Sequence, residues 1–363
     1  MTRTLLIVGA SGRAAAASAV RAGWQPVVID LFADEDTRAM GPVFQCPLEE
    51  YPHGFIALAE RAPPGPWMYT GGLENDPDVV EAISRNRELF GVGPEVLKLV
   101  RDPFALSEFV PMPAMRWEGE TLDAERRWLQ KPLRSSGGFG IAELPLSASE
   151  RGPGSTVYAQ ERVDGSPCSA LFLFVPAPIL LGTCVQLIGE AWLNAPPFRY
   201  CGNIGPLPAD NAMTAELGRI GSALQSFGLR GLIGIDFIRT NDGIRVLEVN
   251  PRYTASVELY ERANGQSLMA EHCIAFSPKG WQYSVRGNAP GSQQIHGKAI
   301  LYAERTFAVP ADHPWRGPDF ADIPTVGSVI PAGQPVVTLF ASADTEPECR
   351  ERLMELALAS APR

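Results

Sequence analysis

Metal-binding cysteine pairs are absent from this sequence. Its cysteines include no CxxC pair, and the chain passes from Met1 straight into the apolar stretch 4–8 with no secretory leader. The six cysteines stand at positions 46, 168, 184, 201, 273 and 349. Free thiols in a reducing compartment are therefore expected, which predicts a cytoplasmic protein without a zinc site.

Clusters of lysine and arginine are also lacking. The formal net charge is -10, and binding to an extended nucleic-acid surface needs grouped cations that neutralise phosphates. Nucleic acid is therefore excluded as the expected partner. A ligand that carries phosphates would need a local site assisted by a metal.

A hydrophobic run that could cross a membrane is missing as well. The longest uncharged stretch, residues 166–189, has the length of a membrane span, but Pro176 and Pro178 interrupt its middle. Two strands joined at these prolines explain the stretch better than a helix. We therefore expect no membrane partner.

The sequence also lacks the complete glycine motif of a dinucleotide-binding site. Residues 4–8 predict a buried strand, Gly9-Ala-Ser-Gly-Arg13 a turn that opens a helix, and Pro26 to Leu31 a second strand that contains Asp30. Gly9 and Gly12 lack the third glycine of GxGxxG. An NAD(P)-dependent oxidoreductase that uses the Gly9–Gly12 turn is thus a weak alternative, and the turn is equally explained as structural.

The strongest positive feature is the segment 231–252. Two apolar runs, 232–238 and 244–249, flank Thr240-Asn-Asp-Gly243 and predict an antiparallel hairpin. Asp236 lies inside the first run, while Glu248 and Asn250 stand two apart in the second and so share a face. Oxygen ligands from adjacent strands suit Mg²⁺ when phosphates complete its coordination.

A simpler explanation of this hairpin remains open. It is an edge hairpin whose Asp and Glu side chains pair with nearby arginines. Pro251 ends the second strand, and Arg252 then places a cation beside the predicted metal site.

A second motif precedes the hairpin. Arg127 to Pro132 predicts a strand that carries Lys131, and the following loop is rich in serine and glycine. Such a loop offers backbone N–H groups to phosphates, with the lysine as a point charge on the same anion. The lysine comes before the glycines, so this is not a Walker loop, and a mobile hairpin tip is the alternative.

Other stretches suggest substrate contacts. Glu74 and Asn75 follow the predicted strand 66–70 at the edge where α/β sheets collect ligands, although Asn75-Asp-Pro77 also suits the start of a helix. Phe198 to Pro206 is predicted to be a loop of glycine and proline around Arg199. We expect a single helix over 95–109, ended by the prolines at 111 and 113.

In this order the motifs resemble the ATP-grasp superfamily. The resemblance spans roughly residues 1–305 and adds an adenine-hinge stretch of the form QE-x-V-x-G, Gln160 to Gly165. The segment 247–258, with Glu258 as a further substrate candidate, and Gly297-Lys-Ala-Ile-Leu-Tyr302 look most like predicted carboligases related to biotin carboxylase. Members of that group are associated with tetrahydromethanopterin and methanofuran pathways, and tyramine-glutamate ligase is a more distant relative.

The resemblance implies a fold of α/β and α+β class, in which a doubly wound pre-ATP-grasp domain precedes a two-lobed ATP-grasp fold. The expected parts are a pre-ATP-grasp domain, a small lid lobe, a large lobe with the metal hairpin, and a β-rich segment that completes the large lobe. Their boundaries are 1–109, 110–165, 166–276 and 277–363.

The resemblance also implies the ligands and the chemistry. ATP and Mg²⁺, with Mn²⁺ as an alternative, would serve a ligase that joins a small-molecule carboxylate to an amine through an acyl phosphate. A bicarbonate-using carboxylase, a regulator that has lost catalysis, and a homodimer are left open. The catalytic and metal residues would be Lys131, Arg252, Asp236, Glu248 and Asn250. The nucleotide would contact Lys131, Ser135, Ser136, Gly137, Gly138, Gln160, Glu161, Arg162 and Val163.

One departure from the family pattern concerns the phosphate site. Many relatives carry an Asp-Lys pair where this chain has Arg101-Asp-Pro103. The first phosphate-binding lysine is therefore missing, or Arg101 or Lys98 replaces it.

Overall fold

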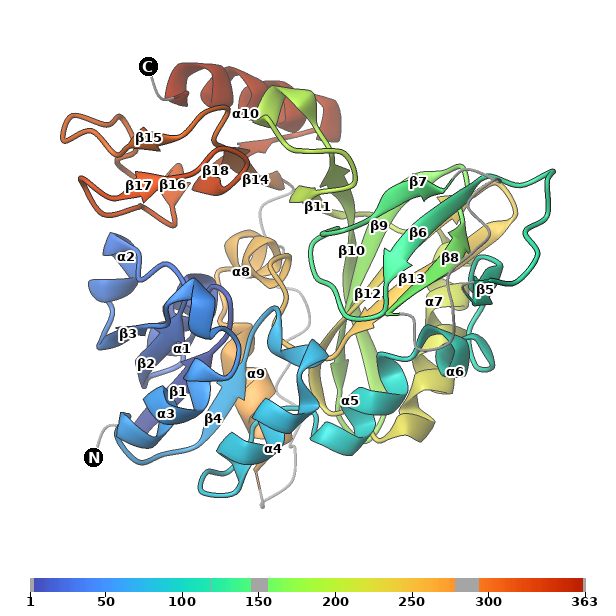
Figure 1. The fold of residues 1–363 in the computed structure, drawn as a ribbon, viewed down its shortest axis with the longest axis horizontal. Coiled ribbons are helices and arrows are strands. Elements are labelled where there is room, and N and C mark those ends of the chain that lie inside the picture. Colours follow the sequence, from blue (N-terminus) through green and yellow to red (C-terminus); the bar gives the residue numbers. More distant parts are fainter. Residues whose placement is uncertain (1–2, 118, 145–155, 278–293, 362–363) are drawn as a thin grey trace.

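The structure is a computed structural model that describes residues 3–117, 119–144, 156–277 and 294–361. Figure 1 shows an amino-terminal α/β unit in blue, a small sheet in green, and a large central sheet that runs from green into orange and red. Helices α8 (Val257–Asn264) and α9 (Leu268–Ala275) lie between the amino-terminal unit and the large sheet.

The amino-terminal unit contains a parallel sheet in the strand order β3-β2-β1-β4. Its central strand β1 is buried from Leu5 to Val8 because it has a parallel neighbour on each side. The strands are β1 (Arg3–Val8), β2 (Trp24–Asp30), β3 (Val43–Gln45) and β4 (Trp67–Tyr69). The helices of the unit are α1 (Arg13–Arg21), α2 (Glu35–Arg38), α3 (Gly54–Arg61) and α4 (Pro77–Ser84).

The helix expected over 95–109 is two helices, so that prediction is wrong. They are α5 (Pro94–Val100) and α6 (Pro103–Ser107). Asp102 separates them, and its side chain accepts the backbone N–H groups of Phe104 and Ala105. Pro103 has no N–H to continue α5, so the capping of a new helix replaces its continuation.

The small sheet is antiparallel and has the strand order β5-β8-β6-β7. Its strands are β5 (Met115–Trp117), β6 (Trp128–Pro132), β7 (Ala142–Leu144) and β8 (Val157–Glu161). β6 carries Lys131. The loop that connects β6 to β7 contains residues 135–140, which we call the glycine loop (Figure 1).

The large sheet has eight strands in the order β13-β12-β9-β10-β11-β14-β18-β16. Strands from the last seventy residues thus extend the same sheet as the metal hairpin, because β14 pairs with β11. The strands are β9 (Ser166–Phe174), β10 (Pro178–Ile188), β11 (Tyr200–Leu207), β12 (Gly231–Thr240), β13 (Gly243–Asn250), β14 (Ile295–Tyr302), β16 (Phe320–Ala321) and β18 (Pro335–Ala343).

Two further α-helices and a two-stranded sheet lie around these sheets, and four short 3-10 helices, Leu48–Glu50, Leu73–Asn75, Ala191–Leu193 and Gln225–Phe227, lie between the other elements. α7 (Asn211–Leu224) buries its apolar face in the same core as β9 and β12, and α10 (Glu346–Ser360) packs on β18. β15 (Phe307–Ala308) pairs with β17 (Val329–Ile330). The predicted fold class is confirmed, because a parallel α/β unit precedes two antiparallel lobes.

The loop expected over 198–206 is largely strand β11, so this prediction is wrong. β11 has a partner on each side, β10 and β14, and this pairing outweighs the local turn preference of its glycines and Pro206. Gly202 shows the cause: a Cβ there would lie 2.1 Å from the carbonyl oxygen of Lys298. The glycine permits close strand packing instead of close approach of a ligand.

The uncharged stretch 166–189 forms β9 and β10, and no helix among the described residues is long and apolar enough to span a membrane. The six cysteines are free and buried, as expected for a reducing compartment.

Candidate active site between the lid and the large sheet

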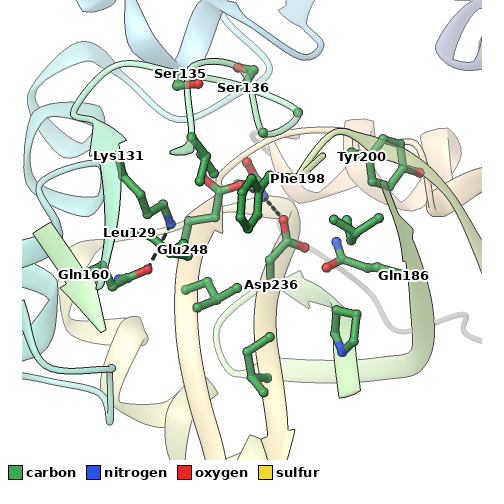
Figure 2. A pocket seen from close by; sticks show the side chains of 18 of the residues that line it. Leu129, Lys131, Ser135, Ser136, Gln160, Gln186, Phe198, Tyr200, Asp236 and Glu248 are labelled. Carbon is green, nitrogen blue, oxygen red and sulfur yellow. Dashed lines mark hydrogen bonds between the residues drawn. The ribbon is translucent and has the colours of Figure 1, made fainter. Parts of the chain in front are cut away.

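A cavity of about 730 Å³ lies between the small sheet and the large sheet. Figure 2 shows Lys131 and Gln160 at one end, Glu248 and Asp236 in the middle, and Gln186 and Tyr200 at the other end. The structure brings every predicted nucleotide, metal and catalytic residue to this cavity. They are Lys131, Ser135, Ser136, Gly137, Gly138, Gln160, Glu161, Arg162, Val163, Asp236, Glu248, Asn250 and Arg252.

The metal hairpin contains a bulge that sequence reasoning missed. Asp236 lies opposite Glu248, whereas the next residue, Phe237, pairs with Val246, so Leu247 is an extra residue in β13. Leu247 and Glu248 consequently both line the cavity. Bulges commonly re-aim a side chain beside a site, and this one brings Glu248 opposite Asp236.

The three predicted metal ligands form one cluster. Asn250 Nδ2 donates to Asp236 Oδ2 at 2.9 Å and to Glu248 Oε1 at 3.3 Å. Burial, followed by repulsion from Glu248, raises the pKa of Asp236 well above its usual value. Burial would also raise the pKa of Glu248, but Arg101 and Lys131 outweigh it and lower that pKa.

This donor set fits Mg²⁺. Two partly buried carboxylates that repel each other are what a divalent cation neutralises, and oxygen donors are what Mg²⁺ prefers. Among the described residues no group of three or more His, Cys, Asp or Glu side chains could hold a metal alone. Ligand oxygens would therefore have to complete the coordination.

Arg101 connects the metal pair to the glycine loop. Its Nη1 donates to Glu248 Oε2 at 3.1 Å and to the carbonyl of Val249 at 3.2 Å. Its Nη2 donates to Asn75 Oδ1 and to the carbonyl of Ser135, both at 3.0 Å. Lys98 points elsewhere, because its exposed ammonium pairs with Glu95 at 2.6 Å. Arg101 thus occupies the site, but protein groups engage both of its terminal nitrogens.

Arg252 is held by a buried carboxylate from the amino-terminal unit. Its Nη2 lies 2.7 Å from Glu74 Oε1 and 3.2 Å from Asn250 Oδ1. Burial would lower the pKa of Arg252, but the adjacent Glu74 outweighs this and raises it. Glu74 does not line the cavity, and its side chain is fully buried, so its contact is with Arg252.

The glycine loop packs against Asn75 and against the segment 198–200. Asn75, which also does not line the cavity, donates to the Ser135 carbonyl at 3.1 Å and to Ser136 Oγ at 3.0 Å. Tyr200 N donates to the carbonyl of Gly137 at 3.0 Å. A Cβ on Gly138 would lie only 1.8 Å from the carbonyl oxygen of Phe198.

The hinge end carries Lys131 and the residues after β8. Lys131 Nζ donates to Gln160 Oε1 at 3.0 Å, while the Nε2 of Gln160 is buried without a partner in the described chain. Glu161 pairs with Arg126 at 2.7 Å, and Arg162 pairs with Glu143. The main chain from Glu161 to Val163 remains at the cavity wall.

The other two substrate candidates, like Glu74 and Asn75, do not line the cavity. The Arg199 guanidinium stacks 4.1 Å from the ring centre of Phe139 on the glycine loop. Glu258 is buried between Arg13 and Lys298, and its Oε2 is 2.8 Å from Lys298 Nζ. Burial would raise the pKa of Glu258, but these two cations lower it. Both residues therefore make contacts within the protein.

Sequence reasoning missed a row of polar residues on the cavity face of the large sheet. In register, Asp236 faces Ser169, and Gln186 faces Asn203, which in turn faces Lys298. Ser169, Gln186 and Asn203 line the cavity. The signal in the sequence was a polar residue, Ser169 or Gln186, within each of the largely apolar strands β9 and β10.

The Gly9–Gly12 turn is filled by protein groups. Asp30 accepts the N–H of Gly12 at 3.0 Å and that of Ala33 at 2.8 Å. A Cβ on Gly9 would lie 2.1 Å from Thr70 Oγ1. Arg13, at the start of α1, points to Glu258 and Asp322. This geometry favours the structural explanation of the turn over a dinucleotide site.

Comparison with known proteins agrees with this geometry. Residues 104–256 match the ATP-grasp domain family. The chain carries an ATP-grasp domain. The predicted superfamily is thereby confirmed. An uncharacterized protein of Methanocaldococcus jannaschii is 26% identical over 143 residues, which cover 39% of this chain and 33% of that protein. The match thus spans about a third of the relative's length.

Solved structures share the fold of the whole described chain. A biotin carboxylase from Campylobacter jejuni superposes with a TM-score of 0.74 at 15% identity, covering 99% of this chain and 91% of the other. An L-amino acid ligase from Bacillus licheniformis gives 0.72 at 14%, with 99% and 98% covered. The N5-carboxyaminoimidazole ribonucleotide synthetase from Thermus thermophilus gives 0.67 at 15%, with 98% and 97% covered. At these identities the likeness concerns the fold.

Proposed function

We propose that this ATP-grasp protein is a carboxylate-amine ligase that forms an acyl phosphate and releases ADP and phosphate. One observation carries the proposal: a single cavity joins the hinge, the glycine loop and the partly buried pair Asp236 and Glu248. The terminal phosphates of ATP would lie between the loop and the hairpin. The family and the ligases that share the fold support this assignment.

The proposed reaction has two steps. A carboxylate oxygen of the substrate attacks the γ-phosphorus of ATP, and the bond from that phosphorus to the oxygen of ADP breaks. The amine nitrogen then attacks the acyl carbon, phosphate leaves, and the nitrogen loses a proton. No protein nucleophile is required.

The residues of the chain bind and orient the reacting groups. Lys131 supplies a positive charge at the hinge end, and Arg252 supplies one that Glu74 and Asn250 hold in place. Mg²⁺ bound at Asp236, Glu248 and Asn250 would neutralise charge on the phosphates. The contacts to Asn75 and Tyr200 hold the loop in place at the cavity.

A bicarbonate-using carboxylase is the second candidate. One of the structures with this fold is a biotin carboxylase domain in complex with MgADP and bicarbonate anion. The two candidates differ in what must be supplied, because the carboxylase needs bicarbonate for turnover and the ligase does not.

We place the ligase in the biosynthesis of a tetrahydromethanopterin-type or methanofuran-type cofactor, a placement that rests on motif resemblance.

Nucleotide binding is tested first. Mg-ADP is expected to raise the melting temperature, because a ligand that binds only the folded state stabilises it, whereas NADPH is expected to have no effect. A shift with NADPH and none with Mg-ADP would reject the ATP site.

The reaction is tested with hydroxylamine, ATP and a panel of carboxylates. The expected products are a hydroxamate, ADP and phosphate, at rates that do not depend on bicarbonate. AMP and pyrophosphate as products, or turnover that stops when bicarbonate is removed, would contradict the ligase mechanism.

A further inference from the structure

The cavity continues beyond the metal pair into a region lined by neutral polar groups. Ser169 lies next to Asp236 in the sheet, and Asn203 Nδ2 donates to Ser169 Oγ at 3.3 Å. The hydroxyl of Tyr200 donates to Asn203 Oδ1. On the facing segment, Thr254 Oγ1 and Ser256 Oγ are 2.9 Å apart. We name this region the neutral end and define it by Ser169, Gln186, Tyr200, Asn203, Thr254 and Ser256.

The other positively charged side chains that line the cavity already have partners within the protein. Arg162 pairs with Glu143, and Lys131 lies at the hinge end beside Gln160. Arg101 is engaged by Glu248 and the loop. Arg252 is the remaining described cation of the cavity. Its Nη2 is held by Glu74, which lies outside the cavity, and by Asn250, while its Nε is buried without a described partner.

The carboxylates that line the cavity also lie away from the neutral end or belong to the metal pair. Glu143 and Glu161 line the hinge end and pair with Arg162 and Arg126. Asp236 and Glu248 form the metal pair. Among the described lining residues, no carboxylate remains at the neutral end to receive a substrate ammonium group.

Gln186 is the side chain at the neutral end that lacks a protein partner. It is 8% exposed and lines the cavity, and its amide has no hydrogen bond to the described residues. Figure 2 shows it pointing toward the space beside Asp236. A buried amide costs free energy unless it is hydrogen-bonded, so this group is suited to a ligand that donates or accepts a hydrogen bond.

We propose that the neutral end binds the carboxylate substrate and selects a compact monocarboxylate with hydroxyl or amide substituents and no second charge. This inference rests on the proposed ligase function. Arg252 binds the carboxylate that is activated, and Gln186, Asn203 and Tyr200 bind the neutral substituents. A second carboxylate or an ammonium group would be buried there without a partner of opposite charge, which disfavours dicarboxylates and amino acids.

The test compares isosteric substrates in the hydroxamate assay. Succinamate is expected to exceed succinate, and 3-hydroxypropionate to exceed β-alanine, each by about tenfold or more in kcat/KM, the effect of about 1.4 kcal/mol. Equal use of both members of each pair, or preference for the charged member, would overturn the inference. No product from any member, while Mg-ADP still raises the melting temperature, would also overturn it and leave the ATP site standing.

A charge-swap variant keeps the test independent of folding. Asn203→Asp retains the shape and can still accept hydrogen bonds from Tyr200 and Ser169, but it adds a negative charge. It is expected to reverse the second preference, so that β-alanine exceeds 3-hydroxypropionate, while the Mg-ADP melting shift stays unchanged. An unchanged preference in a variant that binds Mg-ADP normally would contradict the placement of the substrate beside Asn203.

Discussion

Arg101, which the sequence suggests as a replacement for a missing phosphate-binding lysine, bonds to several other parts of the protein. It reaches Glu248, Asn75 and the carbonyl of Ser135 at 3.0 to 3.1 Å. One side chain therefore links the loop to the metal pair. Its planar fork of donors suits this task, which a lysine cannot reproduce.

We expect Arg101→Met to weaken Mg-ADP binding by about tenfold to a hundredfold, since hydrogen bonds to charged groups contribute about 1.5 to 3 kcal/mol. Calorimetric titration measures this. Lys98→Met is the matched control, because exposed Lys98 bonds only to nearby Glu95 among the described contacts. Unchanged affinity in Arg101→Met, or an equal loss in Lys98→Met, would contradict the role of Arg101 in linking the loop to the metal pair.

The two carboxylates of the metal hairpin can also be tested by single substitutions. Glu248→Gln and Asp236→Asn keep side-chain shape but remove ligand charge, so each is expected to abolish Mg-dependent turnover while the melting temperature without ligand is preserved. Asp242→Asn, at the exposed turn of the same hairpin, should leave turnover intact. Full activity in both cavity variants would mean that these carboxylates bind no metal.

Among the elements, the glycine loop has the clearest steric constraint. Gly137 and Gly138 both have positive φ, 59° and 77°, but a Cβ meets nothing within 4 Å at Gly137 and lies 1.8 Å from the Phe198 carbonyl at Gly138. Substitutions at these two positions therefore distinguish the cost of backbone strain from the cost of losing the contact between the loop and Phe198.

Gly138→Ala is expected to open the loop and lower kcat/KM for ATP by at least tenfold more than Gly137→Ala, which incurs only the strain of about 1 kcal/mol. Steady-state kinetics measure the effect, and limited proteolysis at 135–140 reports loop opening. Equal losses in the two variants would show that docking on Phe198 contributes nothing.

Helix α9 supplies a buried histidine that links two parts of the chain. His272 Nδ1 accepts the N–H of Leu232 in β12 at 3.0 Å, and Nε2 lies 2.9 Å from the carbonyl of Phe90. Both bonds are made when only Nε2 carries a proton. Burial lowers the pKa of His272 from 6.5 to about 4.

Because this pKa is lowered, the unfolded chain binds more protons between pH 6.5 and 4, and stability should fall as pH falls through this window. The His272 contribution is on the order of 3 kcal/mol at neutral pH. His272→Gln should flatten the decline in the free energy of unfolding, measured by denaturant titration at several pH values. The exposed-residue variant His53→Gln should not. Parallel curves for wild type and His272→Gln would reject this explanation.

At the scale of the whole molecule, an ionic network joins the amino-terminal unit to the carboxyl-terminal strands. Arg13 is 4% exposed and bonds to Glu258, and its Nε donates to Asp322 Oδ1 at 3.0 Å. Lys298 completes the cluster on β14. The network holds α1, α8 and the segment at Asp322 together, beside the cavity but outside it.

Removing Arg13 would take away the arginine partner of Asp322 and leave Glu258 with Lys298 alone, so Arg13→Met is expected to cost about 3 to 5 kcal/mol of unfolding free energy. Chemical denaturation measures it. The control Arg21→Met removes a half-exposed partner of Glu261 and should cost less. If the two variants lose equal stability, burial of the network is not its source.

Local pattern alone determined much of this protein. Apolar runs and turn residues predicted the first strands of the amino-terminal sheet and the hairpin, because these depend on neighbours in sequence. The order of Lys131, the glycine loop and the hairpin predicted one superfamily, and residues 104–256 match it.

Only the tertiary structure decided what each charged side chain contacts. Leu247 bulges out and brings Glu248 opposite Asp236, and β11 is a strand because it has two partners. Glu258 and Glu74, which sequence suggests as substrate contacts, are engaged by Arg13 and Arg252 from distant segments. Such pairings join residues far apart in the chain, and the free energy of burying a charge depends on which partner the fold brings to it.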